Sequence, residues 1–191
     1  MRPVHLLVAA TLAVACTPAE PPANTTAAAP APSTVIPDLL RDVGEVEQKM
    51  VDLAKAIPAG KYGYRPGAGV RSVGEVVMHV ASDNYFMPAA VGNAAPATTG
   101  ITGDNYETTV AYEKRAVSPD SAVKELQASF AFLKQAMQAQ TPAALDAKSN
   151  MFGTEYTGQQ VWIMATTHLH EHLGQMIAYA RANNIVPPWS K

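Results

Sequence analysis

The spacing of apolar side chains constrains this chain more than any other feature of its sequence. From Val35 to Ile57 the apolar residues recur at alternating steps of four and three, which places them on one face of a helix. They are Leu39, Val43, Val46, Met50, Leu53 and Ile57. Pro58 and Gly60 then end the segment. A helix with one apolar face has to bury it, so the segment predicts a packed helical domain that begins near Val35.

Two further segments begin with clear helix-capping sequences. Ser72-Val73-Gly74-Glu75 matches a capping box and begins a second helix, which we expect to end at about Met87 because Pro88 blocks its continuation. Ser118-Pro119 begins a third helix, with serine as the cap and proline at the first helical position. Its apolar stripe consists of Val123, Leu126, Phe130, Leu133 and Met137.

The fourth helix is predicted near the end of the chain. Thr157 and Gln160 resemble another capping box, and the helix continues from there to about Ala182. Asn183-Asn184 and Pro187-Pro188 terminate it.

Four helices with single apolar stripes predict an all-α fold, a four-helix bundle. The link between the second and third helices is about thirty residues long, against the usual two to eight. A crossover that leaves these two helices parallel needs such a length. Within it, residues 88–104 read as a loop and Asn105–Arg115 as a short helix.

The first 34 residues predict export rather than folding. Residues 1–15 have one positive charge, an apolar run and then small residues, as in a signal peptide. Cys16 follows directly, in the position of the lipidated cysteine of bacterial lipoproteins. The alternative is cleavage after Ala13-Val14-Ala15, which would leave a soluble exported protein. Residues 16–34 are rich in Pro, Ala and Thr and predict a tether, and the bundle domain occupies residues 35–191.

The charge balance restricts the partners. The chain has 14 Lys and Arg against 16 Asp and Glu, without a run of basic residues, so a nucleic-acid partner is not expected. We expect a small-molecule substrate, a membrane contact through lipidated Cys16, and a periplasmic or membrane-anchored location. We also allow for a homodimer.

The fourth helix carries a histidine pair that suits a metal ion. His168 and His172 are four residues apart, so both rings lie on one largely apolar face and converge on one point. His170 lies on the opposite face and is expected to point to solvent. Glu171 is interpreted as a surface residue. The pair alone leaves open two structural histidines hydrogen-bonded in a core.

His79 favours the metal site over structural histidines. It lies on the inward stripe of the second helix, and a third buried imidazole without a partner costs about 1–3 kcal/mol. One divalent ion satisfies all three rings and leaves positions open for water or substrate. Asp83 lies one turn beyond His79. Three roles remain open for it: a fourth ligand, a hydrogen-bond partner of an imidazole, or a catalytic base.

These residues together resemble the DinB-like (DinB/YfiT-type) metal-binding bundles. The resemblance covers about residues 35–189 and rests on three blocks: Tyr64-Arg65-Pro66 through Ser72-Val73-Gly74-Glu75 to His79; His168-x-x-x-His172-Leu173-Gly174-Gln175; and Tyr179-Ala180-Arg181 to Pro187-Pro188.

This resemblance implies an up-down-down-up bundle and a triad, here His79, His168 and His172, that binds nickel or zinc. Some relatives transfer low-molecular-weight thiols or isomerise thiol adducts. Soluble thiol cofactors are cytoplasmic, however, so the export signal favours a metal-dependent hydrolase in which Asp83 or a loop residue handles the proton. The alternatives are a non-catalytic metal- or ligand-binding lipoprotein and a metal-dependent thiol transferase.

Overall fold

The computed structural model describes residues 35–190 of the chain. The predicted signal peptide, the tether and Cys16 lie outside the described residues. Within the described part, no helix combines the length and apolar content needed to cross a membrane.

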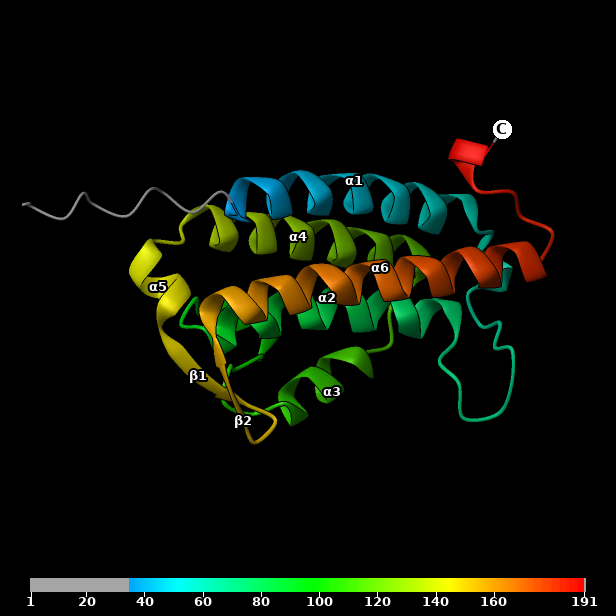
Figure 1. Cartoon of the computed structure of the whole chain (residues 1–191). Coiled ribbons are helices and arrows are strands. Elements are labelled where there is room, and N and C mark those ends of the chain that lie inside the picture. Colours follow the sequence, from blue (N-terminus) through cyan, green and yellow to red (C-terminus); the bar gives the residue numbers. More distant parts are fainter. Residues whose placement is uncertain (1–34, 191) are drawn as a thin grey trace, which may run out of the picture. The chain divides into compact units, whose positions relative to one another are not determined.

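Four long helices form the bundle: α1 (Val35–Ala56), α2 (Val73–Ala90), α4 (Pro119–Gln138) and α6 (Gly158–Ala182). α1 and α2 each pack against both α4 and α6. Figure 1 shows α1 and α6 running in one direction and α2 and α4 in the other. The order along the chain is therefore up-down-down-up, and the parallel pair α2 and α4 is the one that the long crossover predicts.

The predicted caps begin the helices as expected. Ser72 and Thr157 both form complete capping boxes, in which each side chain accepts from the backbone N–H three residues on. Ser118 caps α4 by accepting from the backbone N–H of Ser121. After α6, Asn184 takes a left-handed conformation with φ of 59°, which ends the helix.

The predicted end of the second helix is wrong by about three residues. Helix α2 continues through Pro88 to Ala90. A proline in the last turn removes a single backbone hydrogen bond, and here only two helical residues follow it. Almost all of α2 is buried, because α3 covers its outer side. Tertiary packing therefore outweighs the local cost of the proline.

The crossover contains the expected short helix. α3 (Glu107–Glu113) lies within the range predicted from the sequence and packs on α2. Residues 35–190 also contain three 3₁₀ turns: η1 (Ala59–Lys61), η2 (Ala97–Thr99) and η3 (Pro188–Ser190).

A small α/β insertion between α4 and α6 was not predicted. It consists of α5 (Pro142–Asp146) and an antiparallel hairpin of β1 (Lys148–Met151) and β2 (Thr154–Thr157). Figure 1 shows the hairpin beside α3 at one end of the bundle. Its strands have only four residues each and weak apolar alternation, so the sequence carried little hairpin signal.

The core lies between the four long helices. Its largest fully buried side chains come from α1, α4 and α6 and from α3: Trp162, Tyr112, Phe130, Met50, Leu53, Leu126, Leu133, Met137, Leu169, Met176, Val43 and Val46. This packing fixes the facing surfaces of α2 and α6, from which the candidate site is built.

Candidate metal centre

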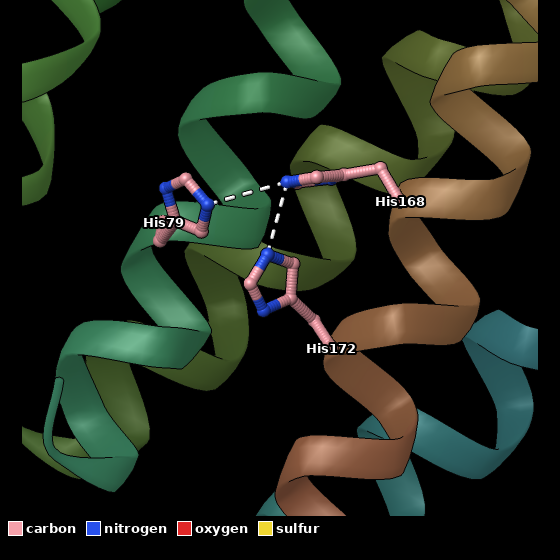
Figure 2. Close-up of side chains that lie close together, drawn as sticks. All are labelled: His79, His168 and His172. Atoms are coloured by element: carbon pink, nitrogen blue, oxygen red, sulfur yellow. Dashed lines mark hydrogen bonds between the residues drawn. The ribbon is translucent and has the colours of Figure 1, made fainter. Parts of the chain in front are cut away.

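The three predicted histidines converge between α2 and α6. The Nε2 atom of His168 lies 3.2 Å from Nε2 of His79 and 3.0 Å from Nε2 of His172 (Figure 2). One nitrogen from each ring lies within 4.8 Å of the others. His170 is exposed and points away, where it contacts Asp42 of α1 at 3.0 Å. The helical phase predicted for this segment is thus confirmed.

Hydrogen bonds fix the tautomer of His79. Its Nδ1 lies 3.2 Å from Oε2 of Glu113 on α3. An ionised carboxylate only accepts, so His79 donates through Nδ1–H. In this tautomer Nε2 is the ring nitrogen that can bind a metal.

His172 is held in the same tautomer as His79, with the hydrogen on Nδ1. Its Nδ1 lies 2.8 Å from Oε1 of Gln175, whose Nε2 donates to the hydroxyl of Tyr179. That hydroxyl in turn donates to the carbonyl of Arg71. Gln175 therefore accepts from Nδ1–H of His172, and the lone pair of Nε2 also faces the cluster.

The facing lone pairs provide a test of whether a metal fits. Nε2 lone pairs repel one another at about 3 Å unless a cation or a proton lies between them. The spacings of 3.0 and 3.2 Å are those expected for ligands of one ion held through bonds of about 2.0–2.1 Å. The donor set of three neutral imidazoles, two of them oriented by hydrogen bonds at the far nitrogen, therefore suits a divalent metal ion.

Burial favours the neutral form of His168 and His172. It lowers the pKa of His168 to about 3, with further lowering by the neighbouring His172 and His79. Burial also lowers the pKa of His172, although the hydrogen bond to Gln175 acts to raise it. Neutral imidazole is the form that binds metal, so the site favours the metal-binding state.

Asp83 lies at the edge of the triad. Its Oδ2 is 3.2 Å from Nε2 of His168 and 3.6 Å from Nε2 of His79. The residue is only 4% exposed, and its Oδ1 has no hydrogen-bond partner in the described part of the chain. Burial raises the pKa of this carboxyl to about 6, although the nearby His79 acts to lower it. An orphaned buried carboxylate oxygen beside three imidazoles is a second feature that a cation would satisfy.

Glu113 is a site residue that the sequence did not reveal. It contacts His79 and forms an ion pair with Arg71. Burial raises its pKa, but the hydrogen bonds from His79 and Arg71 outweigh that effect and lower it to about 2. The residue stands in a seven-residue helix, whose phase a sequence pattern does not determine.

A pocket of about 430 Å³ opens onto the triad. Its polar lining comprises Arg71, His79, Asp83, Thr167, His168, Glu171 and His172, and its apolar lining comprises Met87, Tyr106, Phe152 and Met164. Glu171 is exposed, as expected, but it lies at this pocket rather than on an unrelated surface. The volume is that of a site for a small molecule.

The sequence matches the family model of the DinB superfamily over residues 43–176, which is well over half of the chain. The chain belongs to the DinB superfamily. The matched region contains the whole histidine triad together with Asp83 and Glu113.

Solved structures of DinB-like proteins have the same fold. A DinB-like protein of Bacillus cereus superposes with a TM-score of 0.65 at 14% identity, over 80% of this chain and 95% of that one. A DinB-like protein of Bacillus subtilis gives 0.61 at 17% identity, over 81% and 97% of the two chains. YfiT of Bacillus subtilis, described as a probable metal-dependent hydrolase, gives 0.64 at 14% identity, over 83% and 93%.

A mycothiol-dependent maleylpyruvate isomerase also resembles this DinB-superfamily chain, with a TM-score of 0.60 at 14% identity. The match covers 74% of this chain but only 60% of the isomerase. The search of curated protein sequences gave no significant match.

Proposed function

We propose that this protein holds one divalent metal ion, zinc or nickel, on His79, His168 and His172 and uses it to hydrolyse a small molecule. The observation that carries the proposal is the convergence of three Nε2 atoms beside an open pocket, with two of the rings oriented by Glu113 and Gln175. YfiT, which shares the fold, is described as a probable metal-dependent hydrolase.

The open pocket supports an enzyme over a structural metal site. Structural sites are closed by protein ligands, whereas catalytic sites keep a position open. Here His168 and His172 themselves line a pocket with room for a substrate. A non-catalytic protein that binds a metal or a ligand would show no chelator-sensitive activity in the test below. A metal-dependent thiol transferase would use the same pocket, and the test below separates it by its need for a thiol.

Each residue of the site has a distinct part in hydrolysis. A divalent ion held there supplies a Lewis acid, which polarises a carbonyl or phosphoryl group and makes water more acidic. Asp83 lines the pocket beside His168, and its carboxylate would take a proton from the attacking water and return it to the leaving group. Glu113 and Gln175 hold the imidazoles in the tautomer that the ion requires.

The test is elemental analysis of the purified domain, followed by a screen of ester, amide and phosphate substrates with and without a chelator. We expect about one metal ion per chain and activity that the chelator abolishes and added metal restores. His168→Ala should lose both metal and activity, while His170→Ala, a histidine on the opposite face of α6, should keep both. Activity that appears only when a thiol is added would replace hydrolysis by thiol transfer. A metal-free protein that is inactive with every added divalent ion would contradict the proposal.

We further propose that the protein is exported and anchored through lipidated Cys16, which rests on the sequence of residues 1–16 alone. Fractionation of cells that express the full chain tests this proposal. Cys16→Ser should release the protein from the membrane fraction or leave it as a precursor. Processing and fractionation identical to those of the parent protein would rule out the lipid anchor.

A further inference from the structure

The tip of the hairpin places an aromatic residue in an unusual backbone conformation. Strand pairing of Met151 with Thr154 leaves Phe152 and Gly153 as a two-residue turn, with φ of 55° and 79°. Turns with two positive φ values favour Asn-Gly, because asparagine and glycine tolerate the left-handed region. A phenylalanine at the first position is therefore costly for the turn itself.

The hairpin is attached to the rest of the domain at several points, although the Phe152 side chain at its tip is 59% exposed. Met151, the residue before Phe152, is 2% exposed and anchors the hairpin in the core. At the base of the hairpin, the Ser149 hydroxyl donates to the carbonyl of Ala90 at the end of α2. The Phe152 ring also lies 5.1 Å from the ring of Tyr106, edge to face, and 5.8 Å from that of Phe86. The Phe152 ring therefore packs against two other rings while more than half of the side chain remains open to solvent.

That ring lines the same pocket as the histidine triad. Three apolar side chains from separate elements accompany it: Met87 of α2, Met164 of α6, and Tyr106 at the N-terminus of α3. We call these four residues the apolar wall. Exposed apolar surface in a pocket with polar groups is typical of a ligand site, because a bound ligand covers it. Strained backbone conformations also gather at such sites.

We propose that Phe152 and Tyr106 bind an aromatic, or similarly planar apolar, group of the substrate while its reactive group lies at the triad. This inference rests on the proposed function and narrows it to substrates with an aryl group close to the bond that is cleaved. The polar part of the pocket would then select the reactive group of the substrate. The apolar wall would select the aryl group attached to that reactive group.

Hydroxamates test the subsite without knowledge of the substrate, because they bind protein-held metal whatever group they carry. The protein is loaded with zinc, or with nickel if zinc does not bind, and titrated calorimetrically with acetohydroxamate, benzohydroxamate and 2-naphthohydroxamate. Of benzohydroxamate and 2-naphthohydroxamate, we expect the one with the higher affinity to bind at least about tenfold tighter than acetohydroxamate, since an aromatic group buries a large apolar area.

Phe152→Asn is the informative variant, because it removes the ring and supplies the residue that the turn prefers. We expect the aryl preference to fall to about threefold or less, with metal content confirming an assembled site. Val186→Asn is the matched control, since Val186 is 55% exposed in the segment after α6 and does not line the pocket. It should keep the full aryl preference.

The possible failures are distinguishable. Equal binding of acetyl and aryl hydroxamates by the parent protein, or an aryl preference that survives Phe152→Asn, overturns the aromatic subsite and leaves the metal-dependent function standing. Failure of every hydroxamate to bind the metal-loaded protein shows that the metal has no open position, and it overturns the proposed hydrolase together with the subsite.

Discussion

The two linings of the pocket are built in different ways. The triad stands on two long, tightly packed helices, and the far nitrogens of His79 and His172 are tied by hydrogen bonds to Glu113 and Gln175. The two aromatic members of the apolar wall stand on short elements, with Phe152 in a hairpin turn and Tyr106 at the start of α3, while Met87 and Met164 come from α2 and α6. The Phe152 and Tyr106 rings pack edge to face.

This difference separates two demands on the site. Metal ligands have to be held to within a few tenths of an ångström, which long helices with a packed core provide. Recognition of an apolar group needs area and shape, which short elements supply and which can change without disturbing the core. We therefore expect substitutions at the triad to abolish the site and substitutions at the wall to alter its preference.

The largest effect is expected from the loss of a ligand. His79→Ala should reduce metal affinity by at least about a hundredfold, because two imidazoles from one helix remain and the third donor is gone. Chelation should lower the melting temperature of the parent protein, since a metal bound only by the folded state stabilises it. His79→Ala should lose that response. Metal content by elemental analysis and thermal unfolding with and without chelator measure both effects. Unchanged metal content in His79→Ala would contradict the triad.

A smaller effect is expected at Glu113. Glu113→Gln removes the charge that orients His79 and pairs with Arg71, so metal affinity should fall by about 10- to 100-fold. Competition with a chromogenic chelator measures this change. Glu107→Gln, on the exposed side of the same helix, is the control and should bind metal like the parent. If the two variants behave alike, α3 supports the fold but not the metal.

A weaker loss is expected at Gln175. The amide is neutral, and neutral hydrogen bonds are roughly half as strong as charge-assisted ones. Gln175→Ala should therefore weaken metal binding by about tenfold, less than Glu113→Gln in the same chelator competition. Gln159→Ala, at an exposed position of α6, provides the baseline. A larger loss of metal affinity in Gln175→Ala than in Glu113→Gln would contradict this ranking of the two hydrogen bonds.

The smallest effect concerns the stability of the wall. Phe152→Asn relieves the left-handed backbone at φ of 55° but gives up the ring contacts with Tyr106 and Phe86. We expect a net gain of at most about 1 kcal/mol in the free energy of unfolding of the metal-free protein. Denaturant unfolding measures it. A loss of more than about 1 kcal/mol would show that the hairpin tip is part of the folding core rather than a separate recognition element.

The sequence predicted the convergence of the three histidines better than what surrounds them. Apolar stripes and caps located the four long helices, and the phase of α6 separated His168 and His172 from His170. These inferences succeed because helical periodicity is a local property, repeated over many turns. Glu113 and Phe152 escaped prediction because α3 and the hairpin are too short to carry a reliable period.

The sequence by itself determined the helices, their capped starts and the faces on which the three histidines lie, since backbone hydrogen bonding and side-chain spacing act within a few residues. The tertiary structure decided what surrounds those histidines. It brought Glu113 to His79, buried Asp83 with an unpartnered oxygen, and set Phe152 beside the pocket. Each of these contacts joins segments that are distant in the chain or depends on how helices exclude water, and packing of the whole bundle decides both.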